Sequence, residues 1–404
     1  MENIETSTSA TPAPADAQPS DAQPTDTNQS ADARPTQNAA EQKPPYYNFV
    51  ENPAQMYFAE KWAEQLANFQ KYRDHKTGFS NLDNIQPLYP GLYVIGAISS
   101  LGKTTFIHQM ADQIASEKKP VLYFSYEQSA LELYSKALAR RMNQQYQKDK
   151  TSKRFSSIDI RRGLADGTQE LADQIAAYTA DVENYLNVVE CNFDCPVETI
   201  QEITKKYIKA AEENNLPAPT IIIDYLQVIS PSTINGKAIT EQRASVDHIV
   251  KSLKSFQKSN NLTVICICSL NRMNYMLPVD FESFKESGGI EYTADVVWGM
   301  QLSILSKPEF QHIRDPRTGK THEASIAEQR EMIKDAKCQE IRDIQLVTLK
   351  NRYGASSYTV DFEYEPRYDT FRMPPPPAAP AWVKESWLYK AEQVVGKEEP
   401  LRIE

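Results

Sequence analysis

The stretch Leu92-Tyr-Val-Ile-Gly-Ala-Ile-Ser-Ser-Leu-Gly-Lys-Thr-Thr105 decides the fold predicted for this chain. Its first residues are apolar and partly β-branched, which is typical of a strand buried on both faces. Small residues then lead to Gly-Lys-Thr, and apolar residues recur at helical spacing from Phe106 to Ile114. A strand, a loop and a helix in this order form the context of a phosphate-binding loop.

The residues of this loop have separate expected tasks. Backbone N–H groups from Ser100 to Thr104 are expected to surround the β-phosphate of ATP, aided by the positive helix end. Lys103 is expected to bridge the β- and γ-phosphates, and the Thr104 hydroxyl to hold Mg²⁺. An ordinary strand-to-helix turn is the alternative, but it leaves a lysine unexplained where the helix dipole opposes it. The residues predicted to contact the nucleotide here are Ala97, which replaces the usual leading glycine, Ser99, Ser100, Leu101, Gly102, Lys103, Thr104 and Thr105.

The composition limits the classes of protein. The 404 residues carry a formal charge of −10, which argues against a non-specific nucleic-acid coat but permits a narrow basic channel. No apolar run has membrane-spanning length and no secretory signal is present, so a cytoplasmic protein without membrane contact is expected. The five cysteines are too few and irregular for a disulfide framework, and Cys191 and Cys195 lack a second pair at metal-ligand spacing.

Apolar runs alternate with helical patterns along most of the chain. Strands are expected near 120–126, 187–190, 220–229, 262–268, 294–305, 343–350 and 357–364, the last as an edge strand. The alternation predicts an α/β fold with a mainly parallel central sheet flanked by helices. The expected organisation is a disordered tail (1–45), a linker with an amphipathic helix (46–76), an ATPase domain (77–372) with a charged insertion (about 306–342), and a Pro-rich tail (373–404).

Two apolar features outside the predicted ATPase domain leave alternatives open. The helix predicted over 54–72 places Phe58, Trp62, Leu66 and Phe69 on one face, which packs either on its own domain or on a neighbouring subunit. The tryptophans of the C-terminal tail dock either on the domain itself, which is favoured, or on a partner.

Two acidic residues are expected beside the phosphate loop. Asp224 ends an isoleucine run, and a carboxylate in a buried strand requires a cation, here Mg²⁺ on ATP. Glu127 follows the second predicted strand and is placed to deprotonate the attacking water. The alternative tasks are a helix cap for Asp224 and a plain surface acid for Glu127.

From about residue 77 to residue 371 the chain resembles the RecA-type motor domain of DnaB-type replicative helicases. Each block of the resemblance is weak alone, but the set follows the family's order and covers nearly three-quarters of the chain. The blocks are Thr77-Gly-Phe-Ser-Asn-Leu-Asp83, Ala97-x-x-Ser100-x-Gly-Lys-Thr104, Phe124-Ser-x-Glu-x-Ser129, Ile223-Asp-Tyr-Leu-Gln227, Ser252-Leu-Lys254, Leu270-Asn-Arg272, Glu286-Ser-Gly288 with Ile290-Glu and Ala294-Asp, and Lys350-x-Arg352-x-Gly354.

The resemblance implies a homohexameric ring of RecA-like P-loop NTPase domains with ATP at six subunit interfaces. Lys350 and Arg352 would act on the neighbour's ATP, since a guanidinium suits the developing charge on the γ-phosphate. The alternative for this pair is a solvated edge-strand position. Catalytic roles fall to Glu127, Lys103, Arg352 and Lys350, metal binding to Thr104 and Asp224, further nucleotide contacts to Ser269 and Arg272, and contacts with single-stranded DNA to Lys285, Glu286, Ser287 and Gly288.

Three departures separate the chain from the family pattern. Ser269 stands where the family has a glutamine that senses the γ-phosphate, a disordered tail replaces the helical domain that contacts primase, and the charged insertion is large. The expected function is an ATP-dependent, ring-forming, 5′-to-3′ DNA helicase of replication, of a phage, plasmid or mobile-element type, with primase or a loader as further partner. The alternatives are a RecA- or KaiC-like DNA-binding ATPase without unwinding activity, and a regulatory component of a mobile element.

Overall fold

The computed structural model describes residues 54–375, apart from 193–194, 230–232, 235–236, 239–241, 272–274, 285–286 and 316. The chain divides into two units, residues 1–62 and 63–404. In the first unit the described residues form α1 (Ala54–Met56) and the π-helical turn η2 (Tyr57–Lys61), and the helix then continues as α2 (Trp62–Gln70). Helical structure is therefore observed over the predicted range 54–72, with the last two residues in the 3-10 turn η3 (Lys71–Asp74). The predicted tail 1–45 lies outside the described residues, as does the predicted tail 373–404 from residue 376 onward.

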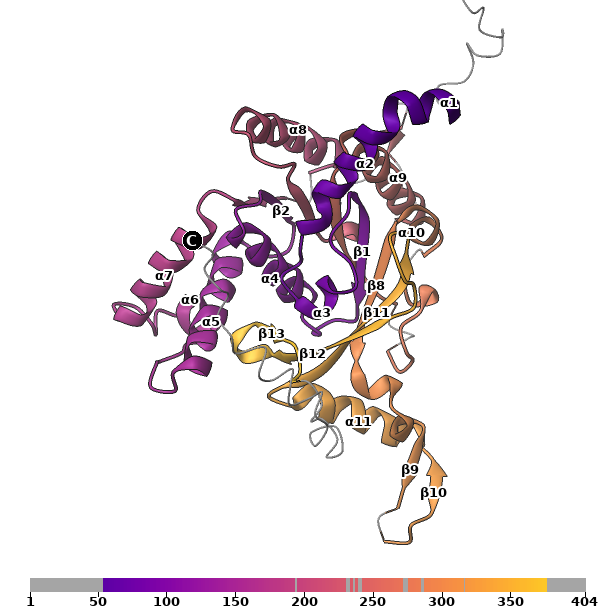
Figure 1. The fold of residues 1–404 in the computed structure, drawn as a ribbon. Helices are drawn as coiled ribbons and strands as arrows, with labels where there is room; N and C mark the ends of the chain where they lie inside the picture. The colour runs from indigo at the N-terminus through magenta and orange to yellow at the C-terminus, as the bar shows by residue number, and fades with distance from the viewer. Residues whose placement is uncertain are drawn as a thin grey trace, which may run out of the picture. The chain divides into compact units, whose positions relative to one another are not determined.

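A nine-stranded sheet forms the centre of the second unit (Figure 1). Its strand order is β13-β12-β11-β8-β1-β7-β4-β2-β3, in which the six strands from β8 to β3 pair in parallel and the other three pair antiparallel. This confirms the predicted fold. The strands are β1 (Gly91–Ala97), β2 (Val121–Ser125), β3 (Leu186–Glu190), β4 (Thr220–Asp224), β7 (Thr263–Ser269), β8 (Val296–Leu302), β11 (Arg342–Asn351), β12 (Thr359–Glu365) and β13 (Thr370–Arg372).

Helices cover both faces of the parallel strands. The chain moves from β1 out to β2 and β3 at one end of the strand order, and then returns from β3 to β4 and β7. Because right-handed crossovers in opposite directions lie on opposite faces, the two sets of helices are separated by the sheet. One face carries α4 (Lys103–Ser116), α5 (Ala130–Lys148) and α7 (Gln169–Val182), and the other carries α8 (Val197–Glu213) and α9 (Gln242–Asn260). Among the described residues, no helix has both the length and the apolar character that crossing a lipid bilayer requires.

Strand β1 lies in the middle of the sheet, between β7 and β8, and all seven of its residues are buried. Its apolar sequence suits this position because neighbours and helices surround it on every side. The carboxyl ends of parallel strands meet at one edge, so the loops after β1, β2, β4 and β7 converge there. The segment from Thr77 to Asp83, which precedes β1, packs on α4. Its Phe79 ring stacks on Phe106 of α4 at a centroid distance of 4.8 Å.

The antiparallel extension differs from the prediction in one respect. The sequence predicts β12 as the edge strand, but β13 pairs with its outer side, so the edge-strand prediction is wrong. Thr370–Arg372 is too short to give a recognisable alternation. Between β8 and β11, the predicted charged insertion contains the hairpin β9 (His312–Arg314) and β10 (Thr321–Glu323), followed by α11 (Ile326–Cys338). The hairpin extends away from the sheet (Figure 1).

Candidate active site

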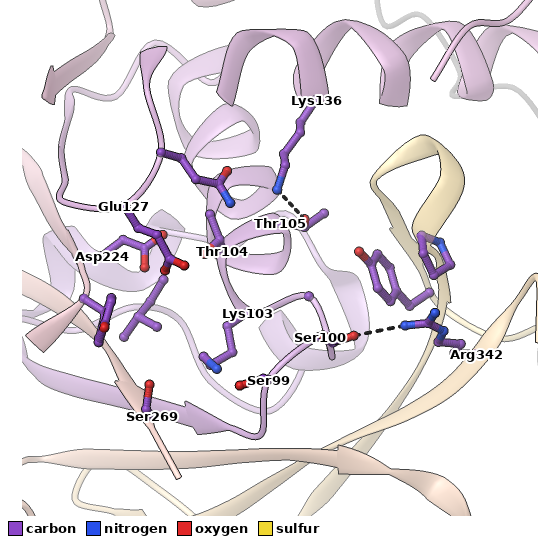
Figure 2. Close-up of a pocket in the computed structure, with 16 residues that line it drawn as sticks. Ser99, Ser100, Lys103, Thr104, Thr105, Glu127, Lys136, Asp224, Ser269 and Arg342 are labelled. Atoms are coloured by element: carbon purple, nitrogen blue, oxygen red, sulfur yellow. Dashed lines mark hydrogen bonds between the residues drawn. The ribbon is translucent and has the colours of Figure 1, made fainter. Parts of the chain in front are cut away.

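A cavity of about 560 Å³ opens where the loops at the carboxyl edge of the parallel strands converge (Figure 2). Parallel α/β sheets bind ligands at this edge, outside the ends of the strands. The cavity is lined by most of the residues predicted from the sequence as the nucleotide and metal site. These are Ser99, Ser100, Gly102, Lys103, Thr104, Thr105, Glu127, Asp224 and Ser269.

The backbone of the loop after β1 depends on Gly102. This residue has φ +86°, a left-handed conformation, and caps the start of α4. A Cβ at this position would lie 2.8 Å from Cε1 of Tyr364, so the loop and β12 approach each other as closely as glycine allows. Ser100 also has a positive φ, of 69°. The loop is thus folded into a tight arch over the helix N-terminus.

Lys103 turns back into this arch. Its Nζ donates to the carbonyl oxygen of Ala97 at 2.8 Å. Burial lowers the pKa of Lys103 below its ordinary value, and the nearby carboxylates of Asp224 and Glu127 offset only part of this effect. Ala97 and Leu101, both predicted to contact the nucleotide, do not line the cavity. Ala97 offers its carbonyl oxygen to Lys103, and the Leu101 side chain is fully buried in the hydrophobic core.

Asp224 ends β4 beneath the loop, and only 1% of its surface is exposed. The Tyr123 hydroxyl donates to Oδ2 at 2.9 Å, while Oδ1 is buried and has no hydrogen-bond partner among the described residues. Burial raises the pKa of Asp224 above its ordinary value, and the hydroxyls of Thr104 and Tyr123 offset only part of this effect. An unpartnered carboxylate oxygen beside a threonine hydroxyl is the hard oxygen set that Mg²⁺ prefers, so these residues fit the predicted ion.

Glu127 follows β2 and faces the cavity with an exposed side chain. Two serines of its sequence block fix the loop on either side. The Ser125 hydroxyl donates to the carbonyl of Gln128 at 2.5 Å, and Ser129 caps α5 through a reciprocal pair of hydrogen bonds with Glu132. The block therefore holds a carboxylate at a set position opposite Lys103.

Sequence reasoning missed part of the cavity wall, including Arg342, Lys136 and Tyr364. Arg342, at the start of β11, donates from Nη1 to the carbonyl oxygen of Ser100 at 3.0 Å. Lys136 of α5 donates to the Thr105 hydroxyl at 3.3 Å, and Tyr364 borders Gly102. The sequence could have indicated Lys136, because it lies two helical turns after Ser129, the N-cap of α5, in the helix that follows Glu127. Arg342 and Tyr364 carry no local signal, because only strand pairing brings them to the loop.

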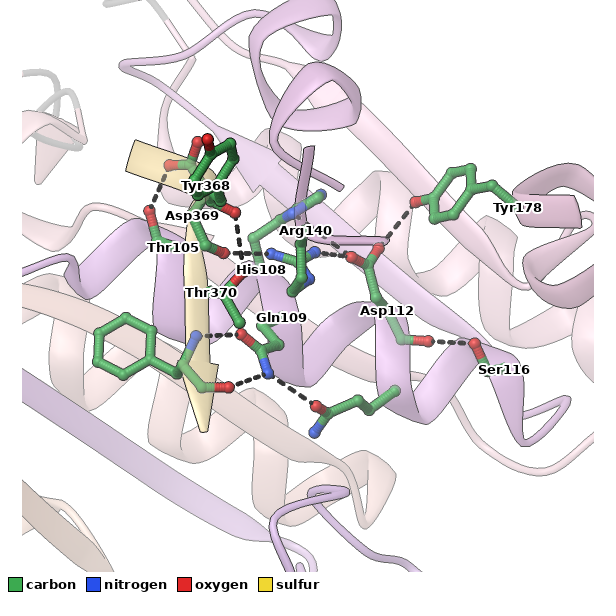
Figure 3. Close-up of polar contacts among 12 residues, drawn as sticks. Thr105, His108, Gln109, Asp112, Ser116, Arg140, Tyr178, Tyr368, Asp369 and Thr370 are labelled. Atoms are coloured by element: carbon green, nitrogen blue, oxygen red, sulfur yellow. Dashed lines mark hydrogen bonds and ion pairs between the residues drawn. The ribbon is translucent and has the colours of Figure 1, made fainter. Parts of the chain in front are cut away.

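A buried polar network supports α4 behind the cavity (Figure 3). Arg140 forms an ion pair with Asp112, whose other carboxylate oxygen accepts from the Tyr178 hydroxyl at 2.7 Å. Arg140 also donates to the carbonyl of Asp369 at 3.1 Å, and the Asp369 carboxylate accepts from Thr105 at 3.3 Å. The network ties α4, α5 and α7 to the turn before β13.

Lys350 and Arg352 do not join the cavity of their own chain. Asn351 pairs with Val296, which is level with Tyr93 at the start of β1, whereas the phosphate loop begins after Ala97. Four residues of strand separate these levels, or roughly 13 Å. Both residues therefore lie at the end of the sheet opposite the cavity. Lys350 is on β11, an interior strand rather than the edge strand of the alternative interpretation, and Arg352 follows the last residue of that strand.

The remaining predicted residues lie at or after the end of β7, some of them in the predicted DNA-facing segment. Ser269 ends β7, and its N–H donates to Oε1 of Gln227 at 3.2 Å. Ser287 and Gly288 begin the short helix α10 (Ser287–Thr293), which packs on α9. Arg272, Lys285 and Glu286 lie outside the described residues.

This chain is similar in sequence and in fold to known proteins. The family model described as "DnaB-like helicase C terminal domain" matches residues 75–373. Replicative DNA helicase DnaB of Buchnera aphidicola subsp. Baizongia pistaciae is 28% identical over 269 residues, which cover 62% of this chain and 53% of that protein. The DnaB of Helicobacter pylori strain ATCC 700392 / 26695 is 26% identical over 303 residues, 69% of this chain and 55% of that protein. The chain spans about half the length of these curated relatives.

Two solved structures share the fold. One, described as an ATPase domain, superposes with a TM-score of 0.57 at 17% identity, covering 80% of this chain and 100% of that chain. A DnaB-like replicative helicase, described with its interactions with primase, gives 0.55 at 17% identity, covering 74% of this chain and 62% of that one. At this identity the likeness concerns the RecA-like fold alone.

Proposed function

This chain belongs to the family of DnaB-like helicase C-terminal domains, and on that premise we propose that it is an ATP-driven DNA helicase motor. It assembles into a hexameric ring, hydrolyses ATP where subunits meet and translocates on single-stranded DNA. One observation carries the proposal: a cavity suited to ATP on one edge of the sheet, and Arg352 on the opposite edge. A ring brings these two edges together between neighbours.

The chain's own residues perform the reaction as follows. Backbone N–H groups of the loop and the ammonium of Lys103 bind the phosphates, in place of the Ala97 carbonyl that Lys103 now contacts. Thr104 and Asp224 hold Mg²⁺, which when bound neutralises phosphate charge. Glu127 accepts the proton of a water that attacks the γ-phosphorus, and the bond from that phosphorus to the bridging oxygen breaks, giving ADP and phosphate.

The charge that develops on the transferred phosphoryl group requires a cation on the side facing away from Lys103. Among the described residues of one chain, the cavity-lining cations besides Lys103 are Lys136 and Arg342, both near the start of α4. Arg352 of the neighbouring subunit would supply this cation, with Lys350 beside it. Single-stranded DNA would lie against the segment around 285–288 in the central channel, and primase or a loader is proposed as a further partner.

Displacement of one strand from a forked duplex tests the proposal. The full chain is expected to displace the strand in the presence of ATP and Mg²⁺, with ATP turnover stimulated by single-stranded DNA. Lys103→Ala should abolish both activities, and Lys209→Ala, at an exposed position of α8, should leave both unchanged. Normal ATP turnover by Lys103→Ala contradicts the proposal.

Ser269 favours a second candidate, a DNA-binding ATPase that does not unwind. Its short side chain ends β7 at the cavity, where the family pattern has a glutamine. DNA-stimulated ATP turnover without strand displacement on the same fork identifies this second function.

A further inference from the structure

Asp295 lies between α10 and β8 and is 2% exposed. Its carboxylate is shared by three donors from three elements of the fold. Oδ2 accepts from the backbone N–H of Leu92 at 2.8 Å and from Nζ of Lys254 at 2.5 Å. Oδ1 accepts from Nη1 of Arg352 at 3.1 Å. A buried carboxylate with this many partners fixes the positions of those partners as strongly as its own.

Arg352 is held by Asp295 twice. Besides the side-chain ion pair, the backbone N–H of Arg352 donates to the carbonyl oxygen of Asp295 at 3.1 Å. The following residue adds a third anchor, since the Tyr353 hydroxyl donates to the carbonyl of Pro90 at 2.6 Å. The turn after β11 is thereby attached to the start of β1.

These contacts leave most of the guanidinium free to meet another molecule. The Arg352 side chain is 53% exposed, and only one of its five N–H donors is used by the Asp295 carboxylate. Lys254 shares the same carboxylate, so the trio of Lys254, Asp295 and Arg352 keeps a net positive charge. The Arg352 guanidinium therefore has a fixed orientation and keeps its charge, which suits it to bind a phosphate outside its own chain.

The neighbouring Lys350 is held by the same stretch of chain. Its Nζ donates to the carbonyl oxygen of Glu291 in α10 at 2.5 Å. The pairing of β11 with β8 shifts register between Thr348 and Lys350, an irregularity that re-aims side chains. Both cations therefore depend on residues 291–295, which two residues separate from the segment proposed to face DNA.

We propose that Asp295 is a positioning residue, which with Lys254 orients Arg352 toward the ATP of the neighbouring subunit. The inference rests on the proposed function, because it gives Arg352 its task in trans. It also gives a task to two sequence blocks without one so far, Ser252-Leu-Lys254 and Ala294-Asp295. Neither residue lines the cavity of its own chain, so their loss should change turnover and not affinity.

The test compares Asp295→Asn with Lys254→Met/Asp295→Asn, which removes both charges and leaves no unpaired ion in the interior. Both variants should lower the DNA-stimulated kcat about 10- to 100-fold, the usual effect of losing a supporting contact, with an unchanged Kd for ATP. Asp295→Asn should have no further effect on kcat in an Arg352→Ala background. Glu363→Gln, which breaks the Arg372 pair elsewhere in the same antiparallel strands, is the matched control with unchanged kcat.

Mixing separates positioning from misfolding. Lys103→Ala subunits lack a working cavity but carry an intact Asp295 and Arg352, so adding them to Asp295→Asn subunits should restore turnover. No restoration, wild-type kcat in the double variant, or an undiminished effect of Asp295→Asn in the Arg352→Ala background each overturn the inference. Wild-type turnover by Arg352→Ala alone would instead contradict the trans-acting cation of the proposed function.

Discussion

Arg342 begins β11 and Arg352 directly follows it, so the two residues lie at opposite ends of the sheet's strands. Arg342 donates to Ser100 at 3.0 Å inside the cavity of its own chain, whereas Arg352 pairs with Asp295 beside the start of β1. A ten-residue strand separates the two ends, or roughly 30 Å. Because β11 pairs on both sides with other strands, it is a rigid connection between one nucleotide site and the surface proposed to serve the next.

Gly102→Ala should weaken ATP binding. The left-handed conformation costs a residue with a Cβ about 1–2 kcal/mol of unfolding free energy, and the added Cβ also displaces the Tyr364 ring. Gly167→Ala is the matched control, since Gly167 has φ +67° and nothing within 4 Å of the added atom. Urea unfolding should show a similar loss of unfolding free energy from the left-handed backbone in both variants. Titration with a fluorescent ATP analogue should show a loss of affinity only for Gly102→Ala. Equal affinities would contradict the assignment of the loop.

Asp224→Asn should change stability in a pH-dependent way in the absence of nucleotide and Mg²⁺. Burial raises the pKa of Asp224, so the native chain retains a proton that the unfolded chain releases. This contribution to stability is full below the unfolded pKa, about 3.9, and is lost as pH rises through the folded pKa. The unfolding free energy of Asp224→Asn relative to wild type should therefore increase as pH rises above about 4.

Urea unfolding at a series of pH values measures this difference, and a constant difference would contradict the raised pKa that burial gives Asp224. With Mg²⁺ and ATP present, the order of stability should reverse. The wild-type melting temperature should rise and that of Asp224→Asn should not.

Arg140→Met should destabilise the fold strongly. Arg140 is 3% exposed, and its loss leaves the buried Asp112 without its cation, at a cost of about 3–5 kcal/mol. Asp112→Asn/Arg140→Met should recover most of that loss, because no charge then remains unpaired. Arg141→Met breaks the neighbouring ion pair with the half-exposed Asp181 and should cost less than about 1 kcal/mol. Chemical denaturation of the four proteins checks these values, and a double variant no better than Arg140→Met would contradict the account.

Arg342→Ala should reduce affinity for ATP about tenfold, the effect of losing one charged hydrogen bond. The guanidinium fixes the Ser100 carbonyl at the rim of the cavity, so its loss loosens the loop without removing a catalytic group. Arg367→Ala serves as control, since Arg367 is exposed and rests on the Tyr368 ring. Calorimetric titration with a non-hydrolysable ATP analogue distinguishes the two variants, and equal affinities would refute a role for Arg342.

The sequence was informative wherever the determinants are local. The strand–loop–helix around Gly102 and the buried isoleucine run before Asp224 follow from residue types and spacing, and the family resemblance drawn from them is confirmed by the match over residues 75–373. The three-residue β13 and the contacts of Arg342 were missed, because they depend on pairing between segments far apart in sequence. No periodicity in the sequence encodes that pairing.

The roles of individual residues remain predictions, and Asp295 illustrates why. Its position after Ala294 is visible in the sequence, but its three donors come from β1, α9 and the end of β11. Only a folded chain shows that one carboxylate joins Lys254 to Arg352. The family resemblance indicated the pair Ala294-Asp295, and the contacts of Asp295 with Lys254 and Arg352 suggest its task.

The central claim is that ATP binds between two copies of this chain, held by one and completed by a cation from the other. The most direct test mixes Lys103→Ala subunits with Arg352→Ala subunits and measures DNA-stimulated ATP turnover. Lys103→Ala alone should be inactive, and Arg352→Ala alone should keep only a small residual rate. In a randomly mixed ring about a quarter of the interfaces pair an intact loop with an intact Arg352, so turnover should return well above the sum of the separate variants. A mixture no more active than that sum, or an Arg352→Ala protein as active as wild type, would contradict the claim.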